Sequence, residues 1–252
     1  MPSWIGDMVM ATPVLHALKA SDPEVRLVVT VRPGLEPVLA GLPCVDGIET
    51  ASLRGLFGPL SDARRLRHLA ADTVVLLPNS FRSGLFARMS GARRRIGYAR
   101  DGRGWLLTHP VPAPARGMPS PTLLDYVELV EQTFEIIVKD HAPRLETTET
   151  EERAADRLLE GLKPPFVLLN PGANRTDKRW PAGHFARFAD ALRNEHACTI
   201  LVNGSPAETE LVRTVVEGGG AGMVSLPERG CTLGALKAVI RRAELMVSND
   251  TG

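Results

Sequence analysis

Residues 166–185, FVLLNPGANRTDKRWPAGHF, contain a short apolar run, a long polar connection and the start of a helical pattern. The apolar run ends in Asn-Pro-Gly, and the next helix is predicted to begin with Pro181 as its first residue. A connection between a strand and a helix needs only about two to six residues. The extra length, which includes Arg175, Lys178 and Arg179, predicts that this loop holds an anion.

The same alternation of apolar runs and helical patterns extends along the chain in both directions. Most of the runs are nearly continuously apolar, which is typical of parallel strands that are covered on both faces. Strands that alternate with amphipathic helices indicate an α/β protein with a doubly wound parallel sheet. Strands are predicted at 25–31, 73–78, 166–170, 199–204 and 245–249, and helices at 12–20, 80–90, 121–136, 149–161, 181–195, 205–217 and 232–243.

A change of composition at residues 140–165 divides the chain into two predicted domains. This segment carries two proline regions and an acidic, helix-forming run, with a helix cap predicted at Thr148 or Thr150. A second series of strand, loop and helix follows it. We therefore predict two Rossmann-like domains, residues 1–148 and 149–252, in tandem with a cleft between them.

The patterns at both ends of the sequence indicate that the chain is a fragment of a longer protein or an incomplete gene model. Only MPSW precedes Ile5-Gly6-Asp7, which is too short for the strand that opens a Rossmann-like domain. The final residues, VSNDTG, complete a strand and begin helix-capping chemistry where a further helix is expected. The second domain is therefore expected to be incomplete.

The composition disfavours several classes of protein. The chain has 252 residues, a net charge of +1 and 44% hydrophobic residues, whereas nucleic-acid-binding domains are usually strongly basic. Its three cysteines, Cys44, Cys198 and Cys231, form no CxxC pair, so neither a zinc site nor a disulfide framework is indicated. This pattern fits a reducing cytoplasm. The sequence has no signal peptide and no apolar run of the roughly 18 residues that span a bilayer, so a soluble or at most peripheral protein is predicted.

Gly6 and Asp7 form the first candidate site. Gly6 permits a tight turn and a close approach of a ligand to the backbone, and Asp7 is expected at the carboxyl edge of a strand, where ligands bind in such sheets. An aspartate there could act as general base on a sugar or alcohol hydroxyl. The alternatives are that Asp7 caps a helix, or that Thr12 is the cap and Pro13 the first helical residue.

Asn79 and Ser80 form the second candidate site, because they follow a predicted buried strand and precede a helix. This position would aim their side chains into a cleft, although a plain helix cap is the favoured interpretation. The nearby run Arg93-Arg94-Arg95 could contact phosphates or an acidic membrane surface. Such a run is more often a solvated edge.

The opening stretch and the chain's last residues provide two further candidate sites. The backbone amides of the loop and of the following helix N-terminus are expected to attract a phosphate, and Lys178 would add a point charge to a diphosphate. His184 is predicted to lie on the helix surface. Asp250 and Thr251 follow a strand, where they could bind ribose or sugar hydroxyls, or cap a helix.

Several common nucleotide-binding motifs are absent from the sequence. It contains neither the GxxxxGK[ST] P-loop nor the GxGxxG fingerprint, and no His, Glu and Asp residues have metal-ligand spacing. A kinase, an NTPase and a typical NAD enzyme are therefore disfavoured.

Taken together, four stretches resemble glycosyltransferase family 9, the ADP-heptose:lipopolysaccharide heptosyltransferases, and most closely its heptosyltransferase II branch. They span most of the chain in the order that the family has, and their combination is specific. The stretches are PSWIGDMVMATPVLHALK (2–19), LLPNSFRSGLFARMSGARRRIGY (76–98), NPGANRTDKRWPAGHFARFADAL (170–192) and VSNDTG (247–252).

The resemblance implies a GT-B fold and inverting, metal-independent transfer of a heptose from ADP-heptose to the lipopolysaccharide inner core, with no cofactor. The first domain would take the acceptor and the second the nucleotide-sugar. Asp7 is then implied as the base, and Thr176 and Lys178 as ligands of the diphosphate that stabilise the leaving ADP. The resemblance further implies substrate contacts at Gly6, Asn79, Ser80, Gly172, Arg179, Asp250, Thr251 and Gly252.

The implied acceptor is a lipid-anchored glycan on the cytoplasmic face of the inner membrane. A cytoplasmic protein with peripheral membrane contact and no nucleic-acid partner is therefore expected. The arginine runs at 64–67 and 93–95 would contribute roughly 1 kcal/mol per basic residue near an anionic surface. Two alternatives are a family 9 transferase that uses another nucleotide-sugar for a different surface glycan, and an inactive truncated module that binds nucleotide weakly.

Overall fold

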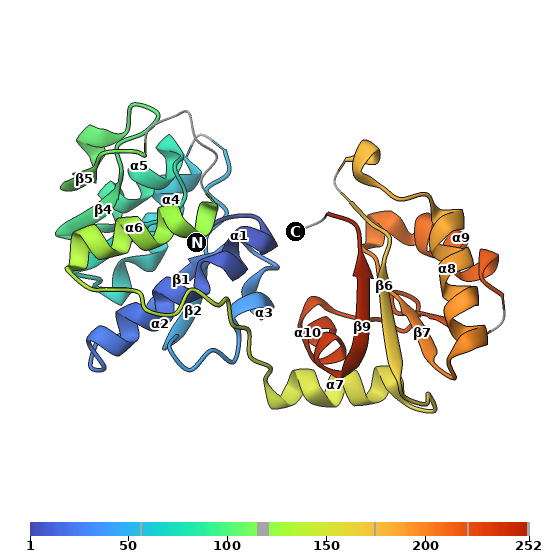
Figure 1. Ribbon diagram of the computed structural model, residues 1–252. Coiled ribbons are helices and arrows are strands. Elements are labelled where there is room, and N and C mark those ends of the chain that lie inside the picture. Colours follow the sequence, from blue (N-terminus) through green and yellow to red (C-terminus); the bar gives the residue numbers. More distant parts are fainter. Residues whose placement is uncertain (56, 115–120, 174, 221, 251–252) are drawn as a thin grey trace. The chain divides into compact units, whose positions relative to one another are not determined.

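The computed structural model describes residues 1–55, 57–114, 121–173, 175–220 and 222–250, and it leaves the side chain of Thr176 undescribed. The chain divides into two compact units, Met1–Leu145 and Glu146–Gly252, a division three residues before the expected boundary after residue 148. Each unit is an α/β body with parallel strands, as the alternating sequence pattern predicts (Figure 1).

The first unit contains two parallel sheets among its described residues. Strand β1 pairs with β2, and strands β3, β4 and β5 pair in that order. Its helices and strands are α1 (Ile5–Met10), α2 (Thr12–Ser21), β1 (Val28–Val31), α3 (Glu36–Leu39), β2 (Gly47–Thr50), α4 (Gly58–Arg65), η1 (Leu66–Leu69), β3 (Thr73–Leu76), α5 (Phe81–Ser90), β4 (Arg94–Tyr98), η2 (Gly104–Leu106), β5 (His109–Val111) and α6 (Thr122–Phe134).

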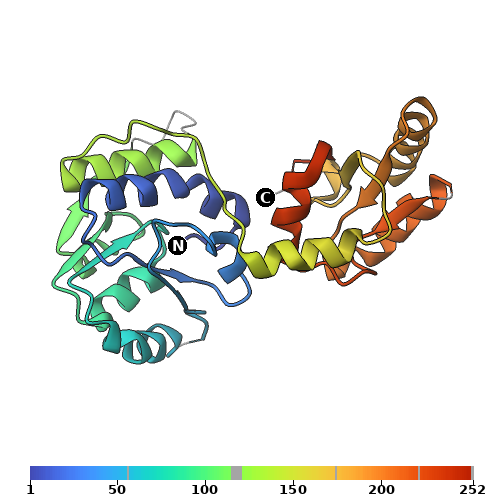
Figure 2. The ribbon, with the colours of Figure 1, turned by 90° about the horizontal axis from the view of Figure 1, so that it is seen from below.

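Helices cover both faces of the β3–β4–β5 sheet. Ile96 and Tyr98 of β4 pack in one buried cluster with Val14 of α2 and with α6, whereas Leu76 of β3 packs in another with Ala87 of α5. Consequently α2 and α6 lie along one face of this sheet and α5 lies against the other (Figure 2).

The second unit is built on one four-stranded parallel sheet with the order β8-β7-β6-β9. In the part of the chain that the structure describes, its elements are α7 (Glu149–Leu159), β6 (Phe166–Asn170), η3 (Thr176–Lys178), α8 (Ala182–Glu195), β7 (Thr199–Val202), η4 (Pro206–Glu208), α9 (Thr209–Gly218), β8 (Met223–Ser225), α10 (Leu233–Arg242) and β9 (Ala243–Ser248).

Strand β6 explains why the opening stretch is almost continuously apolar. Phe166 and Leu168 pack with α7 and α10 in one core, and Val167 and Leu169 pack with α8 and α9 in the other. Successive side chains of a strand point to opposite faces, so a strand with helices on both faces needs apolar residues at every position. Figure 1 shows α8 and α9 on one side of β6, and α7 and α10 on the other.

Strands β2, β4, β5 and β8 are not predicted by the sequence pattern. Strand β4 is missed because it begins with two charged residues, Arg94 and Arg95, which interrupt the apolar pattern of a buried strand. The guanidinium of Arg95 donates to the Leu106 carbonyl at 3.0 Å, and that of Arg94 lies 5.5 Å from the centre of the Phe134 ring. Arg94 is nevertheless exposed, as a solvated edge predicts, whereas Arg95 is half-buried, so that prediction is wrong for Arg95.

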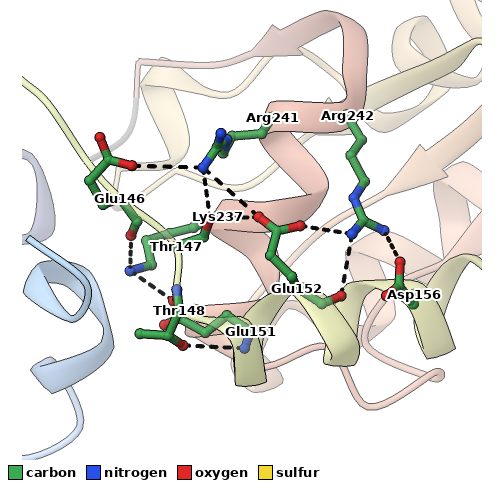
Figure 3. Close-up of polar contacts among 9 residues, drawn as sticks. All are labelled: Glu146, Thr147, Thr148, Glu151, Glu152, Asp156, Lys237, Arg241 and Arg242. Carbon is green, nitrogen blue, oxygen red and sulfur yellow. Dashed lines mark hydrogen bonds and ion pairs between the residues drawn. The ribbon is translucent and has the colours of Figure 1, made fainter.

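A network of charged side chains joins α7 to α10 in the second unit (Figure 3). Lys237 Nζ lies 3.2 Å from Glu151 Oε2 and donates to the Glu146 carbonyl at 2.7 Å. Both charged side chains of this pair are nearly buried. Beside them, Arg242 binds the Glu152 carboxylate at 2.7 Å. The start of α7 is therefore attached to α10 by a buried ion pair and a more exposed one.

The cap of α7 belongs to the same network. The Thr148 hydroxyl accepts from the Glu151 amide at 3.3 Å, and the Glu151 carboxylate accepts from the Thr148 amide at 2.8 Å. This reciprocal arrangement is a capping box. Of the two predicted caps, Thr148 is confirmed and Thr150 is wrong.

Replacing Glu151 with alanine is expected to lower the free energy of unfolding by about 3–5 kcal/mol, since it leaves the Lys237 ammonium buried without its carboxylate. Burial already lowers the pKa of Lys237, and Glu151 opposes that shift. Urea unfolding followed by circular dichroism measures the loss. The control is Glu149→Ala, whose ion pair with Arg153 is exposed and should matter little. Equal effects of the two variants would contradict the prediction.

Within the described ranges, no helix is both long enough and apolar enough to cross a membrane.

Candidate active site

The loop after β6 is attached to the end of β9. Asn249, which follows β9, donates from Nδ2 to the Pro171 carbonyl at 2.7 Å and accepts from the Trp180 amide at 3.0 Å. Asn170, at the end of β6, donates from Nδ2 to Ser248 Oγ at 3.2 Å. Because β6 and β9 are parallel neighbours, both loops leave the same edge of the sheet, where ligands bind in such folds. The third and fourth candidate sites are therefore one site.

Two of the three cations of this loop, Lys178 and Arg175, are paired with carboxylates. Lys178 Nζ forms an exposed ion pair with Asp250, and the hydrogen bond from Lys178 holds the pKa of Asp250 below its ordinary value. Arg175 binds Asp177 at 2.7 Å in another exposed pair. A diphosphate that binds Lys178 must therefore share the ammonium with Asp250 or displace it.

Gly172 and Arg179 hold the loop in shape. Both Nε and a terminal nitrogen of Arg179 donate to the Ala173 carbonyl, at 2.9 and 2.7 Å. Gly172 is buried, and a Cβ at this position would collide with the Glu208 carboxylate. The Arg179 guanidinium therefore has an intramolecular role that its positive charge did not predict, and Gly172 offers only its backbone.

The helix after the loop differs slightly from its prediction. Helix α8 begins at Ala182 with Pro181 before it, so Pro181 is the residue that precedes the helix and not its first member. The Trp180 ring folds over the first turn, with its centre 5.4 Å from that of His184 and 5.0 Å from that of Phe185. His184 is consequently half-buried, so its predicted position on the helix surface is confirmed only in part.

Gly6 and Asp7 lie inside helix α1, and the prediction of a loop at this position is wrong. Trp4 is the residue before the helix and Asp7 is the third residue within it, so Asp7 is not the cap. Thr12, the other predicted cap, is the first residue of α2. An acidic side chain in a first turn is favoured by the helix dipole.

The Asp7 carboxylate is half-buried and has spare hydrogen-bonding capacity. In the parts of the chain that are described, no amide or side chain donates a hydrogen bond to it. It lies close enough to Tyr126 of α6 to contribute, after burial, to raising the pKa of that phenol. A carboxylate with unoccupied lone pairs can accept a proton from a bound hydroxyl, as a general base must.

Asn79 and Ser80 take different roles in the loop between β3 and α5. The Ser80 hydroxyl accepts from the Ser83 amide at 3.2 Å, which confirms the helix-cap interpretation for Ser80. Asn79 Oδ1 accepts instead from Arg103 at 3.1 Å. Sequence reasoning missed Arg103, because a buried arginine in an arginine-rich sequence has no distinct pattern of its own.

Some of the predicted site lies outside the described residues. This applies to Thr251, Gly252 and the side chain of Thr176, although the backbone of Thr176 begins η3. Over the described residues, no group of three or more His, Cys, Asp and Glu side chains could hold a metal ion.

Comparisons with known proteins agree with the sequence pattern. Residues 60–252 match the model of glycosyltransferase family 9 (heptosyltransferase). The lipooligosaccharide heptosyltransferase 2 of Haemophilus ducreyi is 26% identical over 100% of this chain and 76% of its own length. The lipopolysaccharide heptosyltransferase 2 of Salmonella typhimurium is 29% identical over 79% of this chain and 61% of its own length. The chain therefore matches between about three fifths and three quarters of these two relatives.

A solved structure supports the same fold. The E. coli ADP-heptose lipopolysaccharide heptosyltransferase II superposes with a TM-score of 0.84 and 24% identity, covering 99% of this chain and 77% of that one. The predicted GT-B-like α/β fold with parallel sheets is thereby confirmed.

Proposed function

The chain belongs to glycosyltransferase family 9, and on this premise we propose that it transfers a heptose from ADP-heptose to the inner core of lipopolysaccharide. The transfer inverts the anomeric configuration and uses no metal ion or cofactor. The observation that carries the proposal is the union of the β6 loop with the end of β9 through Asn249, because it gathers Lys178, Asp250 and the loop amides at a ligand-binding edge.

The second unit binds the donor in this proposal. Lys178 neutralises the diphosphate, and the amides at the start of α8 add the partial positive charge of a helix N-terminus. Thr176 contributes a hydroxyl, and Asp250, with Thr251 and Gly252, lines the sugar. Asp250 releases Lys178 to the phosphates and becomes available to the donor's hydroxyl groups.

The first unit binds the acceptor and supplies the base. The Asp7 carboxylate removes the proton of the acceptor hydroxyl while that oxygen attacks the anomeric carbon. The bond between the anomeric carbon and the diphosphate oxygen breaks, and its electron pair leaves with ADP. Lys178 stabilises the charge that develops on the leaving oxygen, which is a role for electrostatic catalysis. The acceptor sugar is lipid-anchored in this proposal, so the protein works in the cytoplasm at the cytoplasmic face of the inner membrane.

The reaction is tested by supplying the purified protein with ADP-heptose and a core oligosaccharide that ends in heptose. We expect one ADP released for each oligosaccharide that gains a heptose, measured by a coupled ADP assay and by mass spectrometry. The rate should persist in EDTA, since no metal takes part in the proposed steps. Loss of activity in EDTA would contradict the metal-independent mechanism.

A nucleotide competition experiment distinguishes the donor. ADP is expected to displace ADP-heptose, whereas UDP and GDP should compete weakly. A preference for UDP or GDP would point to another nucleotide-sugar and remove ADP-heptose from the proposal. Absence of both binding and turnover would favour an inactive module.

A further inference from the structure

Arg103 is fully buried in the first unit, between β4 and η2. Its guanidinium donates to the Tyr98 carbonyl at 3.0 Å, to Ser83 Oγ at 2.9 Å and to Asn79 Oδ1 at 3.1 Å, and it also binds the Pro78 carbonyl. Burial lowers the pKa of Arg103 to about 10, so the group stays charged at neutral pH. An arginine presents several donors in a fixed planar fork, and here that fork fastens the loop after β3 to the loop after β4.

Two glycines make room for this side chain. A Cβ at Gly97 would lie 3.1 Å from a terminal nitrogen of Arg103 and 3.2 Å from Leu76 Cβ. A Cβ at Gly84 would lie 3.0 Å from Leu106 Cδ1 and 3.4 Å from Arg103 Cβ. Both spacings are tight for buried atoms. The sequence therefore provides a fitted space for a charged side chain that would otherwise be costly to bury.

The two loops that Arg103 joins carry two exposed aromatic rings. Phe81, at the start of α5, is 44% exposed, and Trp105, in η2, is 66% exposed. Their ring centres are 6.3 Å apart with the planes inclined by 50°. Strands β3 and β4 are parallel neighbours, so both rings follow the carboxyl edge of the sheet, which is the ligand-binding edge.

We propose that Phe81 and Trp105 form a carbohydrate-binding subsite for the acceptor glycan, and that Arg103 is the positioning residue that holds the two rings together. The inference rests on the proposed function, which makes the first unit the acceptor unit. The C–H groups of a pyranose ring carry partial positive charge and pack against the negative face of an aromatic ring.

The groups beside the rings suit a sugar. Asn79 Oδ1 is taken up by Arg103, which leaves its amide nitrogen as a donor, and Ser80 next to it is exposed. A sugar presents an apolar face and hydroxyl groups together, and this edge offers rings and hydrogen-bonding groups together. A membrane surface would instead use a broad apolar helix face, whereas α5 buries Phe86 and Ala87 in the unit.

The test is a binding measurement that needs no turnover. A de-acylated core oligosaccharide ending in heptose is titrated into the protein by calorimetry, and ADP is titrated separately by the same method. We expect Trp105→Ala to weaken oligosaccharide binding about tenfold, Trp105→Phe to restore most of it, and both to bind ADP as the wild type does. The matched control is Ile137→Ala, which removes a 76% exposed apolar side chain of the same unit.

Phe81→Ala and the double variant complete a double-mutant cycle. The rings act as one platform, so the double variant should bind little worse than either single variant. Unchanged oligosaccharide binding by Trp105→Ala would overturn the proposal. So would a loss seen only with phosphatidylglycerol vesicles, because it would assign the rings to a membrane. If the oligosaccharide binds through Trp105 but ADP-heptose gives no transfer, the proposed reaction fails and the subsite stands.

Discussion

Asp7→Asn is expected to lower the turnover of heptose transfer by roughly 10²–10⁴-fold, the range that a positioned general base contributes. The substitution keeps the size of the side chain and its place in the first turn of α1, but an amide cannot accept the proton of the acceptor hydroxyl. The Asp7 carboxylate has no hydrogen-bond donor among the described residues, so its loss breaks no internal contact there. Steady-state rates, together with calorimetric binding of ADP, separate catalysis from donor binding.

The matched control is Asp125→Asn. Asp125 is also half-buried, also lies in the first turn of a helix and also contributes to raising the pKa of Tyr126. It should therefore reproduce any electrostatic disturbance of this region without removing the base. Turnover is expected to stay near the wild-type value in Asp125→Asn. If Asp7→Asn kept full turnover, or if both variants lost it equally, Asp7 would not be the base.

Much of the fold is predictable from the sequence because parallel strands covered on both faces are nearly continuously apolar. Strand β6 occurs at the predicted residues, and α5 and α7 begin at predicted caps, Ser80 and Thr148. Strands β4 and β8 are missed for a physical reason. One starts with arginines whose guanidinium groups find partners inside the unit, and the other is three residues long.

The candidate site is predictable only where its chemistry is local. The polar loop after β6 and the SNDTG segment are visible in the sequence as separate stretches, but their union through Asn249 requires the parallel pairing of β6 with β9. The role of Arg103 cannot be predicted for a similar reason, since its burial depends on Gly84 and Gly97 in two other elements. Contacts between residues distant in the chain decide both cases.

Lys178→Ala is expected to lower turnover by roughly 10²–10³-fold, the range measured when one electrostatic stabiliser of a developing negative charge is removed. It should also weaken ADP binding, because in the proposed mechanism the ammonium contacts the diphosphate before and after transfer. Lys178→Arg keeps the charge but changes its shape from a compact ammonium to a planar fork, so partial activity is expected. Rates and ADP dissociation constants for the two variants are measured side by side, with exposed Lys163→Ala as the control.

Because Lys178 is paired with Asp250, a substitution of Asp250 is expected to have the opposite effect on ADP binding. If Asp250 competes with the diphosphate for Lys178, as their exposed pairing suggests, then Asp250→Asn should strengthen the binding of ADP, which carries no heptose. The same variant should reduce the gain in affinity that ADP-heptose shows over ADP, because in the proposed mechanism it loses a carboxylate that contacts the heptose. Tighter ADP binding in Asp250→Asn with weaker ADP binding in Lys178→Ala would establish that the diphosphate replaces Asp250 as the partner of Lys178. ADP affinity that responds to neither residue would show that the diphosphate binds elsewhere.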